Sequence, residues 1–409
     1  MIPFILKLAV RNGLRNKRRS AFTVVSLLLG IGLFVAAKGF VDGIEKTLVG
    51  TQIDAEHGHL RVVTAKYQAD EDYRPLDIDF AEAAAVQKLI VDQLPGALTT
   101  TRVQAAVQIG NGLRSLSCRA VIADPAAYAA FFRIGTLTPP VDKTQPYAWL
   151  GKDLAAAFKF KVGDRLMLKA KTRPGAINAM DGVVIAGLIE SGSGMTDNFT
   201  ILLDAAWANE FLHLEPGFAT EVFARFPDGA QAELADTRLM AAIQGLHVET
   251  WQEATQFVRD LNDVRKQHFY LVVFIVLLIG ALSVVNTCLM SGFERRHEIG
   301  TLLALGYPQR RVVVLFITEA VIIGVLGAVI GVALGTALSG YYTSHGLPLP
   351  EFNAQEAVMP MPPVLFFEWT PVVALKGLII GFFVTVLASL YPAWRSSRLD
   401  PISALRTEG

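Results

Sequence analysis

Four long apolar runs constrain this chain more than any other feature of its sequence. They cover 20–42, 268–293, 312–340 and 371–394, and they contain few charged residues. A helix needs about 20 consecutive apolar residues to cross the hydrocarbon core of a bilayer. The hydrophobic content of 52% is too high for an ordinary soluble domain and too low for a chain that is membrane throughout. We therefore expect four transmembrane helices and one soluble domain, which would occupy 43–267.

The basic residues are distributed unevenly around these runs. They cluster before the first run, in 294–311 and in the tail 395–409, whereas the short loop 341–370 contains no Lys or Arg. Short flanks rich in Lys and Arg stay in the cytoplasm. Both termini and 294–311 are therefore predicted to be cytoplasmic, with 43–267 and 341–370 on the outer side. Because Lys plus Arg equals Asp plus Glu, nothing indicates a nucleic-acid partner.

The N-terminal segment allows two interpretations. In 1–19, apolar residues share one side of a helical wheel and Lys and Arg residues share the other, which is typical of an amphipathic helix lying on the membrane surface. The alternative is a basic flank that only sets topology. The first apolar run is longer than the apolar part of a typical signal peptide, and Ala36-Ala37-Lys38 is a poor cleavage site. We therefore expect an uncleaved membrane anchor.

The predicted outer domain alternates strand-like and helix-like segments, so its expected class is α+β. Asn111-Gly112 between two strand-like segments indicates a hairpin. The expected strands are 58–63, 100–109, 113–122, 161–168, 183–189, 200–203 and 248–251, and the expected helices are 80–94 and 230–243. Residues 253–268 are also predicted to be helical and to run directly into the second span, which would couple the domain rigidly to the membrane. The Gly-rich stretch 191–194 is interpreted as a mobile loop, because it lacks the context of a phosphate-binding loop.

The sequence lacks the short motifs that are typical of catalytic and metal-binding sites. It contains no Gly-x-x-x-x-Gly-Lys-[Ser/Thr] motif, no Gly-x-Ser-x-Gly motif and no His-Glu-x-x-His motif. His57 and His59 form the one close histidine pair, and no third ligand is apparent. Cys118 and Cys288 are not expected to meet. We therefore expect a non-catalytic chain with no cofactor or metal of its own.

A segment directly after the second run combines dense charge with apolar residues. It is helix-permissive until Gly306, and such a helix suits docking into a groove on a soluble partner. The alternative is a loop that sets topology and rests its apolar residues on the membrane. The residues of this candidate coupling segment are Glu294, Arg295, Arg296, Glu298, Ile299, Gly300, Leu302, Leu305 and Gly306.

The third run contains a single charged residue, Glu319. A charge inside a membrane is costly unless it faces other helices or a partner, so we expect Glu319 to pack or hydrogen-bond within the bundle. Small residues recur every four positions, which allows close helix packing. They are Gly327, Gly331 and Gly335 in the third run, and Gly32 and Ala36 in the first. The sequence leaves open whether these faces build the bundle or a dimer.

These segments resemble the FtsX-type permease superfamily, which includes MacB-like macrolide exporters and LolC/LolE-like lipoprotein-release permeases. The similarity lies in Glu-Arg-x-x-Glu-Ile-Gly…Ala-Leu-Gly at 294–306, in Glu319, and in Tyr-Pro-Ala…Asp-Pro-Ile-x-Ala-Leu-Arg at 391–406. The order of spans and outer domain is also similar. Residues 58–62, Gly-His-Leu-Arg-Val, are similar to the lipoprotein-release branch.

The resemblance implies a MacB-type periplasmic core domain and a mechanism called mechanotransmission in the bacterial inner membrane. Two copies of a separate ABC ATPase, which bind ATP and Mg, would move the coupling segment. A second permease, identical or homologous, would complete the transporter, and an extracytoplasmic carrier or adaptor could assist it. Because the chain has no ATPase motif, the ATPase is expected in a partner chain.

Four functions agree with this sequence. The first is ATP-driven extraction or expulsion of a lipidated or amphipathic cargo on the outer side. The second is ATP-driven regulation of an extracytoplasmic enzyme, and the third is export of a small hydrophobic compound or peptide. The fourth is a passive anchor or receptor, for which the coupling segment would be dispensable.

Overall fold

The computed structural model describes residues 17–140, 144–227, 245–348 and 364–399. The chain forms two compact units. The helical unit comprises Met1–Lys46, Leu261–Pro348 and Val364–Gly409, and the mixed unit comprises Thr47–Asp260 and Leu349–Pro363. The predicted helix 230–243, most of the predicted segment 1–19 and the end of the tail lie outside the described residues.

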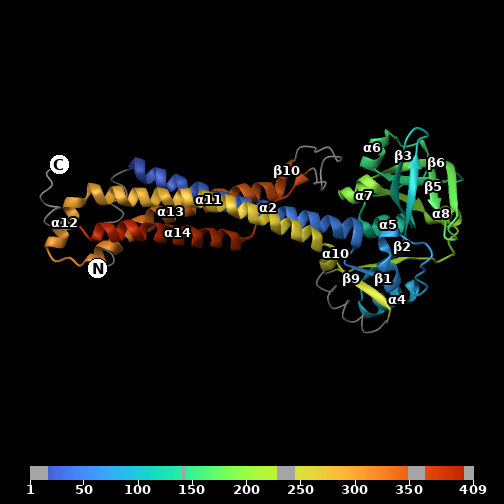
Figure 1. Cartoon of the computed structure of the whole chain (residues 1–409), viewed down its shortest axis with the longest axis horizontal. Helices are drawn as coiled ribbons and strands as arrows, with labels where there is room; N and C mark the ends of the chain where they lie inside the picture. Colours follow the sequence, from blue (N-terminus) through green and yellow to red (C-terminus); the bar gives the residue numbers. More distant parts are fainter. Residues whose placement is uncertain (1–16, 141–143, 228–244, 349–363, 400–409) are drawn as a thin grey trace. The chain divides into compact units, whose positions relative to one another are not determined.

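The long helices of the helical unit run alongside one another (Figure 1). Among the described residues, four helices are long and apolar enough to cross a membrane. They are α2 (Lys17–Gln52), α11 (Gln256–Glu294), α13 (Gln309–His345) and α14 (Pro371–Ser397). α11 is one continuous helix, so the predicted continuity between 253–268 and the second span is confirmed from Gln256 onward. A short helix, α10 (Trp251–Ala254), precedes it with a Thr250–Glu253 capping box.

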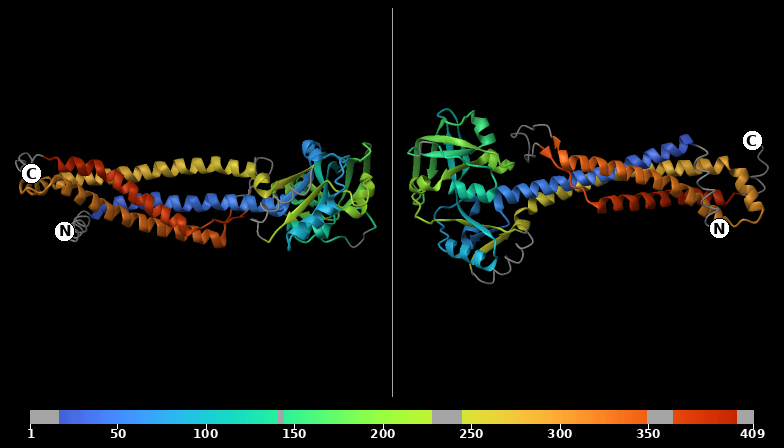
Figure 2. Two further views of the ribbon diagram at one scale, coloured as in Figure 1. Left: turned by 90° about the horizontal axis from the view of Figure 1, so that it is seen from below. Right: turned by 180° about the vertical axis from the view of Figure 1, so that it is seen from behind.

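Helix α13 packs closely on α2 through small residues. A Cβ atom on Gly331 would lie 2.8 Å from the carbonyl oxygen of Leu28, and one on Gly335 would lie 2.8 Å from the carbonyl oxygen of Gly32. Gly327 contacts the same helix. The two views of Figure 2 show these helices within one bundle. The stripe of glycines that the sequence left unassigned therefore packs within this chain.

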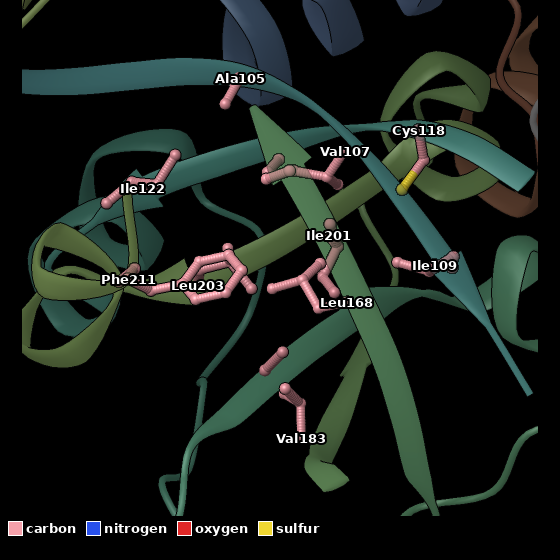
Figure 3. Close-up of a cluster of buried hydrophobic side chains, with 14 of the residues drawn as sticks. Ala105, Val107, Ile109, Cys118, Ile122, Leu168, Val183, Ile201, Leu203 and Phe211 are labelled. Carbon is pink, nitrogen blue, oxygen red and sulfur yellow. The ribbon is translucent and has the colours of Figure 1, made fainter. Parts of the chain in front are cut away.

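The larger part of the mixed unit is a closed barrel. Strand β2 pairs antiparallel with both β3 and β5, and this double pairing closes the series β2, β3, β7, β4, β6, β5. Its interior is filled by aliphatic side chains such as Val107, Ile109, Leu168 and Ile201 (Figure 3). The strands are β2 (Leu98–Gly110), β3 (Ser115–Ala123), β4 (Tyr147–Gly151), β5 (Arg165–Lys171), β6 (Ile177–Ile189) and β7 (Thr200–Asp204).

A smaller antiparallel sheet shares β2 with the barrel. The first residues of β2, Leu98–Arg102, pair with β8, and the order continues through β1 to β9. Helix α4 (Ala83–Gln93) covers this sheet and buries Val86 and Ile90 against it. The strands are β1 (Leu60–Thr64), β8 (Glu221–Arg225) and β9 (Leu246–Thr250). The predicted α+β class is confirmed, and so is the hairpin at Asn111-Gly112.

Short helices connect the strands of the mixed unit. Asp124 caps α5 by accepting a hydrogen bond from the backbone nitrogen of Ala127, and Asp204 caps α8 in the same way. They are α3 (Ala65–Ala69), α5 (Pro125–Phe132), α6 (Lys152–Phe158), α7 (Gly194–Phe199) and α8 (Ala205–Leu212). The Gly-rich stretch 191–194 leads into α7, where the Asp197 carboxylate accepts hydrogen bonds from Ser191 and Gly192.

Buried ion pairs cross the smaller sheet. Glu221 of β8 has no exposed surface and accepts hydrogen bonds from Arg61 (2.7 Å), Arg102 (2.5 Å) and Gln104 (2.9 Å). Burial alone would raise the pKa of Glu221, but the two neighbouring guanidinium groups outweigh burial and hold its pKa far below the ordinary range. This carboxylate therefore stays charged and joins three strands, β1, β2 and β8.

Candidate functional site

The candidate coupling segment forms a separate short helix in the helical unit. α11 ends at Glu294, α12 covers Arg296–Ala304, and α13 begins at Gln309. α12 lies at the end of the bundle where α11 gives way to α13 (Figure 1). Glu298 in its first turn interacts favourably with the helix dipole, and Gly306 follows its end with a φ of 83°. The predicted helical segment and its end at Gly306 are both present.

One face of α12 is fixed to the bundle. Ile299 is 5% exposed and packs with Val312 and Phe316 of α13 and with Ala393 of α14. The half-buried Leu303 joins the same cluster. Ile299 therefore attaches α12 to the bundle and is not available on a docking face.

An arginine links α12 to the interior of α13. The Arg295 Nε atom lies 3.0 Å from a carboxylate oxygen of Glu298, and its Nη1 atom lies 3.1 Å from a carboxylate oxygen of Glu319. Glu319 is 8% exposed. A buried carboxylate is costly unless a cation compensates it, and Arg295 supplies that cation. A displacement of the start of α12 would therefore move Arg295 away from Glu319, the buried carboxylate of α13.

Polar contacts that the sequence analysis did not identify surround this pair. Arg19 of α2 lies 3.1 Å from Glu294, and the Thr23 and Thr287 hydroxyls are 2.7 Å apart in a buried position. A cavity of about 20 Å³ lies between Thr23, Thr287 and Glu319, and a volume of this size accommodates about one water molecule. The sequence contained one sign of this contact: Thr23 and Thr287 are hydroxyl residues within two apolar runs.

The opposite face of α12 is open in the helical unit. Leu305, directly after the helix, is 81% exposed, while Glu298 is exposed and Leu302 half-buried. Gly300 is buried and Arg296 is half-buried. The predicted coupling residues are thus divided between an anchoring face and a charged outer face that ends in one exposed leucine.

The histidine pair does not form a binding site of its own. His57 ends the π-helix Ile53–His57, and Gly58 then turns the chain with a φ of 62°. His59 therefore precedes β1 and is not part of it as predicted, and its Nδ1 atom accepts a hydrogen bond from the backbone nitrogen of Phe226. Among the described residues, no group of three or more His, Cys, Asp or Glu could hold a metal ion. Cys118 and Cys288 are both free and buried.

Comparison with known families defines the class of this chain. The family "MacB-like periplasmic core domain" matches residues 20–242, and the family "FtsX-like permease C-terminal" matches residues 270–401. The chain belongs to the FtsX-like permeases that carry a MacB-like periplasmic core domain. It is a non-catalytic, multi-pass membrane subunit of an ABC transporter, it has an extracytoplasmic domain, and its class implies a partner ATPase.

The individual relatives differ in how much of their length this chain spans. An uncharacterized ABC transporter permease of Mycobacterium tuberculosis is 28% identical over 63% of this chain, which corresponds to only 29% of that protein. The lipoprotein-releasing system transmembrane protein LolC of Xylella fastidiosa is 22% identical over 97% of both chains. The macrolide export ATP-binding/permease protein MacB of Rhodospirillum rubrum is 25% identical over 98% of this chain and 60% of its own length.

Proposed function

We propose that this chain couples ATP hydrolysis by a separate ATPase to extraction or expulsion of a lipidated or amphipathic cargo on the outer side of a bacterial cytoplasmic membrane. The observation that carries the proposal is the ion pair between Arg295 and Glu319, because it connects a helix with an open polar face to the interior of the bundle. Motion imposed on α12 would reach α13 through this pair and through Ile299.

The proposed orientation rests on charge. Arg295, Arg310 and Arg311 flank α12 and Arg296 is its first residue, whereas 341–370 at the other end of α13 contains no Lys or Arg. The positive-inside rule supports a cytoplasmic position for α12 and both chain termini, which would allow a soluble cytoplasmic ATPase to reach α12. ATP and Mg would bind to that partner.

The proposed assembly has two permease copies, identical or homologous, and two copies of the ATPase. An extracytoplasmic carrier or adaptor would accept or pass on the cargo. The helices α2 and α11 support force transfer, because each is continuous over more than 35 residues, from Lys17 to Gln52 and from Gln256 to Glu294.

The proposed cargo class follows from a relative that this chain covers over nearly its whole length. The similarity to the lipoprotein-releasing system protein LolC extends over 97% of both chains, whereas the similarity to MacB covers 60% of that protein. The four candidate spans also contain few buried charges. A lipidated molecule handled at the outer leaflet needs no hydrophilic path across the bilayer, in agreement with these spans.

The test begins with ATPase docking. Leu305→Asp places a charge at the exposed end of α12 and should abolish co-purification of an ATPase identified by its nucleotide-binding motifs. Leu113→Asp is the matched control, because Leu113 is 92% exposed on the β2–β3 hairpin of the other unit. If Leu305→Asp retains ATPase binding as fully as the control, α12 is not the docking site.

The second step measures transport. Proteoliposomes containing the chain, its ATPase and a fluorescent diacylated peptide should release the peptide when ATP is added. Release that does not require ATP would contradict the proposal. Recovery of a cell-wall hydrolase in place of a lipid-binding carrier would favour the regulatory function instead.

A further inference from the structure

The mixed unit contains a large cleft that the proposed coupling mechanism does not use. Its volume is about 820 Å³, which lies within the range of about 300–1,000 Å³ typical of small-molecule sites. All residues that line it belong to the mixed unit. Part of its lining is apolar and open to solvent: Met195 is 55% exposed, Phe199 50% and Phe257 68%. The cleft therefore offers apolar contact area that no side chain of the described residues covers.

Most of the charge in the cleft is already neutralised. Arg119 lies 2.8 Å from Glu56 and also donates to Thr200. Arg61 and Arg102 share Glu221, and Arg61 also pairs with Glu71 and Glu249. Three of the four arginines that line the cleft are thus held by carboxylates of this unit.

Arg74 is the exception. In the described part of the chain, no carboxylate oxygen lies within the 4.0 Å of an ion pair with its guanidinium group, although the side chain is half-buried. Burial and the positive charge of Arg119 both lower the pKa of Arg74. The residue follows the short 3₁₀ helix Glu71–Tyr73 with a φ of 44°, a conformation that is uncommon for residues other than glycine. Among the described residues, this half-buried cation in the cleft therefore has no carboxylate at ion-pair distance.

The remaining carboxylates of the cleft do not pair with Arg74 either. Asp72 and Asp153 line the cleft as well, but neither forms an ion pair with Arg74 within the described residues. A neutral apolar ligand would bury Arg74 further without a partner, and burial of an unpaired charge is costly. An acidic group next to Arg74 would remove that cost.

We propose that this cleft binds an anionic amphiphile, with its acidic group paired to Arg74 and its apolar chain against Met195, Phe199 and Phe257. A phospholipid has this chemistry, and so does a lipidated peptide that carries an acidic side chain. This inference rests on the proposed function, in which the chain acts on an amphipathic cargo. It adds that Arg74 of the outer domain would bind the acidic group of that cargo.

The experiment uses the full chain in nanodiscs of phosphatidylcholine, without ATPase or ATP. The probe is dodecyl phosphate with a photoreactive diazirine in its chain, and cross-linked residues are identified by mass spectrometry. We expect cross-links at Met195, Phe199 or Phe257. Arg74→Gln should raise the concentration for half-maximal labelling at least about tenfold, since it removes the charged donor that pairs with the acidic group of the probe. Arg74→Lys should retain part of the affinity.

The matched control is Arg133→Gln. Arg133 is also an arginine of the mixed unit with positive φ, at 50°, but it does not line the cleft, so its replacement should leave labelling unchanged. Thermal unfolding of each variant shows that the fold is intact. A dodecyl maltoside probe with the same diazirine should label the cleft weakly, and inorganic phosphate alone should not compete.

Four outcomes would overturn the inference: equal labelling by the maltoside probe, full competition by inorganic phosphate, cross-links confined to the helical unit, or no effect of Arg74→Gln. Failure of this site and failure of the proposed function remain distinguishable. If Arg74→Gln abolishes labelling but ATP-driven release continues, cargo is held elsewhere and the coupling proposal stands. If wild-type labelling fails while release persists, the cleft is not the cargo site.

Discussion

The guanidinium group of Arg295 lies 3.1 Å from the carboxylate of Glu319, and it is the same group whose Nε atom contacts Glu298. One side chain thus holds the first turn of α12 and the interior of α13 together. Both carboxylates share the guanidinium group of Arg295 through different nitrogen atoms, so a partner that binds Glu298 would change the interaction of Arg295 with Glu319. Binding of a partner at α12 would therefore alter an ion pair inside the bundle.

A charge-exchange experiment tests this relationship. Arg295→Glu places a third carboxylate beside those of Glu298 and Glu319 and should reduce ATP-driven release at least tenfold while ATPase docking persists. The double variant Arg295→Glu with Glu319→Arg should recover part of the activity, and a double-mutant cycle should give a coupling energy of roughly 0.5–3 kcal/mol. Additive effects of the two changes would show that the pair does not act as a unit.

The membrane-spanning helices could be predicted from the sequence, but the contacts between them could not. Apolar run length and basic flanks were sufficient to identify α2, α11, α13 and α14. The pairing of Arg295 with Glu319 was not predictable, because the two residues lie on different helices and their contact depends on how α12 folds back. Ile299 was predicted to be a coupling residue for a similar reason. The apolar face of a helix can be identified from the sequence, but the element that packs on it cannot, and here that element is the bundle itself.

Close packing between α13 and α2 gives a second prediction. A Cβ atom on Gly331 would lie 2.8 Å from the Leu28 carbonyl oxygen, so Gly331→Ala must push the two helices apart. Overpacking of this kind costs about 1–3 kcal/mol, which should lower the unfolding temperature of the purified protein by several degrees. Gly340→Ala on the same helix is the control, since nothing lies within 4 Å of its built Cβ atom. Equal unfolding temperatures for the two variants would contradict the packing.

In the mixed unit, alternation predicted several strands but not all of them. β5 alternates strictly between exposed and buried residues and was identified. β4 and β8 are buried along their whole length and were missed. β8 begins with Glu221 and ends with Arg225, and two charged residues ordinarily indicate a solvent-exposed segment. Their burial depends on arginines and carboxylates that come from distant strands, which a single sequence does not reveal.

The buried Glu221 makes the stability of the mixed unit depend on pH. Its pKa is lower in the folded protein than its ordinary value of 4.5. The stabilising contribution of its charge is therefore complete above that value and is lost as the pH falls below it. Replacement by Gln leaves Arg61 and Arg102 without this carboxylate, and breaking a buried pair costs about 3–5 kcal/mol.

The measurement compares thermal unfolding of wild type and Glu221→Gln between pH 3 and pH 7. The difference between them should be largest near pH 7 and should shrink below about pH 4.5. Glu215→Gln serves as the control, because Glu215 is 77% exposed and pairs with Arg173 at the surface; its effect should stay below about 0.5 kcal/mol. A constant difference across the whole pH range would contradict the assigned charge state.

The final prediction concerns the orientation of α12. Burial raises the pKa of the Cys118 thiol to about 12, so this cysteine should react slowly with maleimides in the folded protein, and Cys288 is buried as well. A cysteine introduced at an exposed position should therefore react much faster than the two native cysteines. Leu305→Cys and Leu113→Cys suit this purpose, since the two leucines are 81% and 92% exposed and lie on different units.

In right-side-out membrane vesicles, a membrane-impermeant maleimide should label the cysteine at position 113 and not the one at position 305. In inverted vesicles the result should be reversed, and detergent should expose both positions. Because the chain crosses the membrane between α12 and the β2–β3 hairpin, this pattern follows directly from the predicted topology. Labelling at position 305 in right-side-out vesicles would place α12 on the same side as the mixed unit, where no cytoplasmic ATPase could reach it.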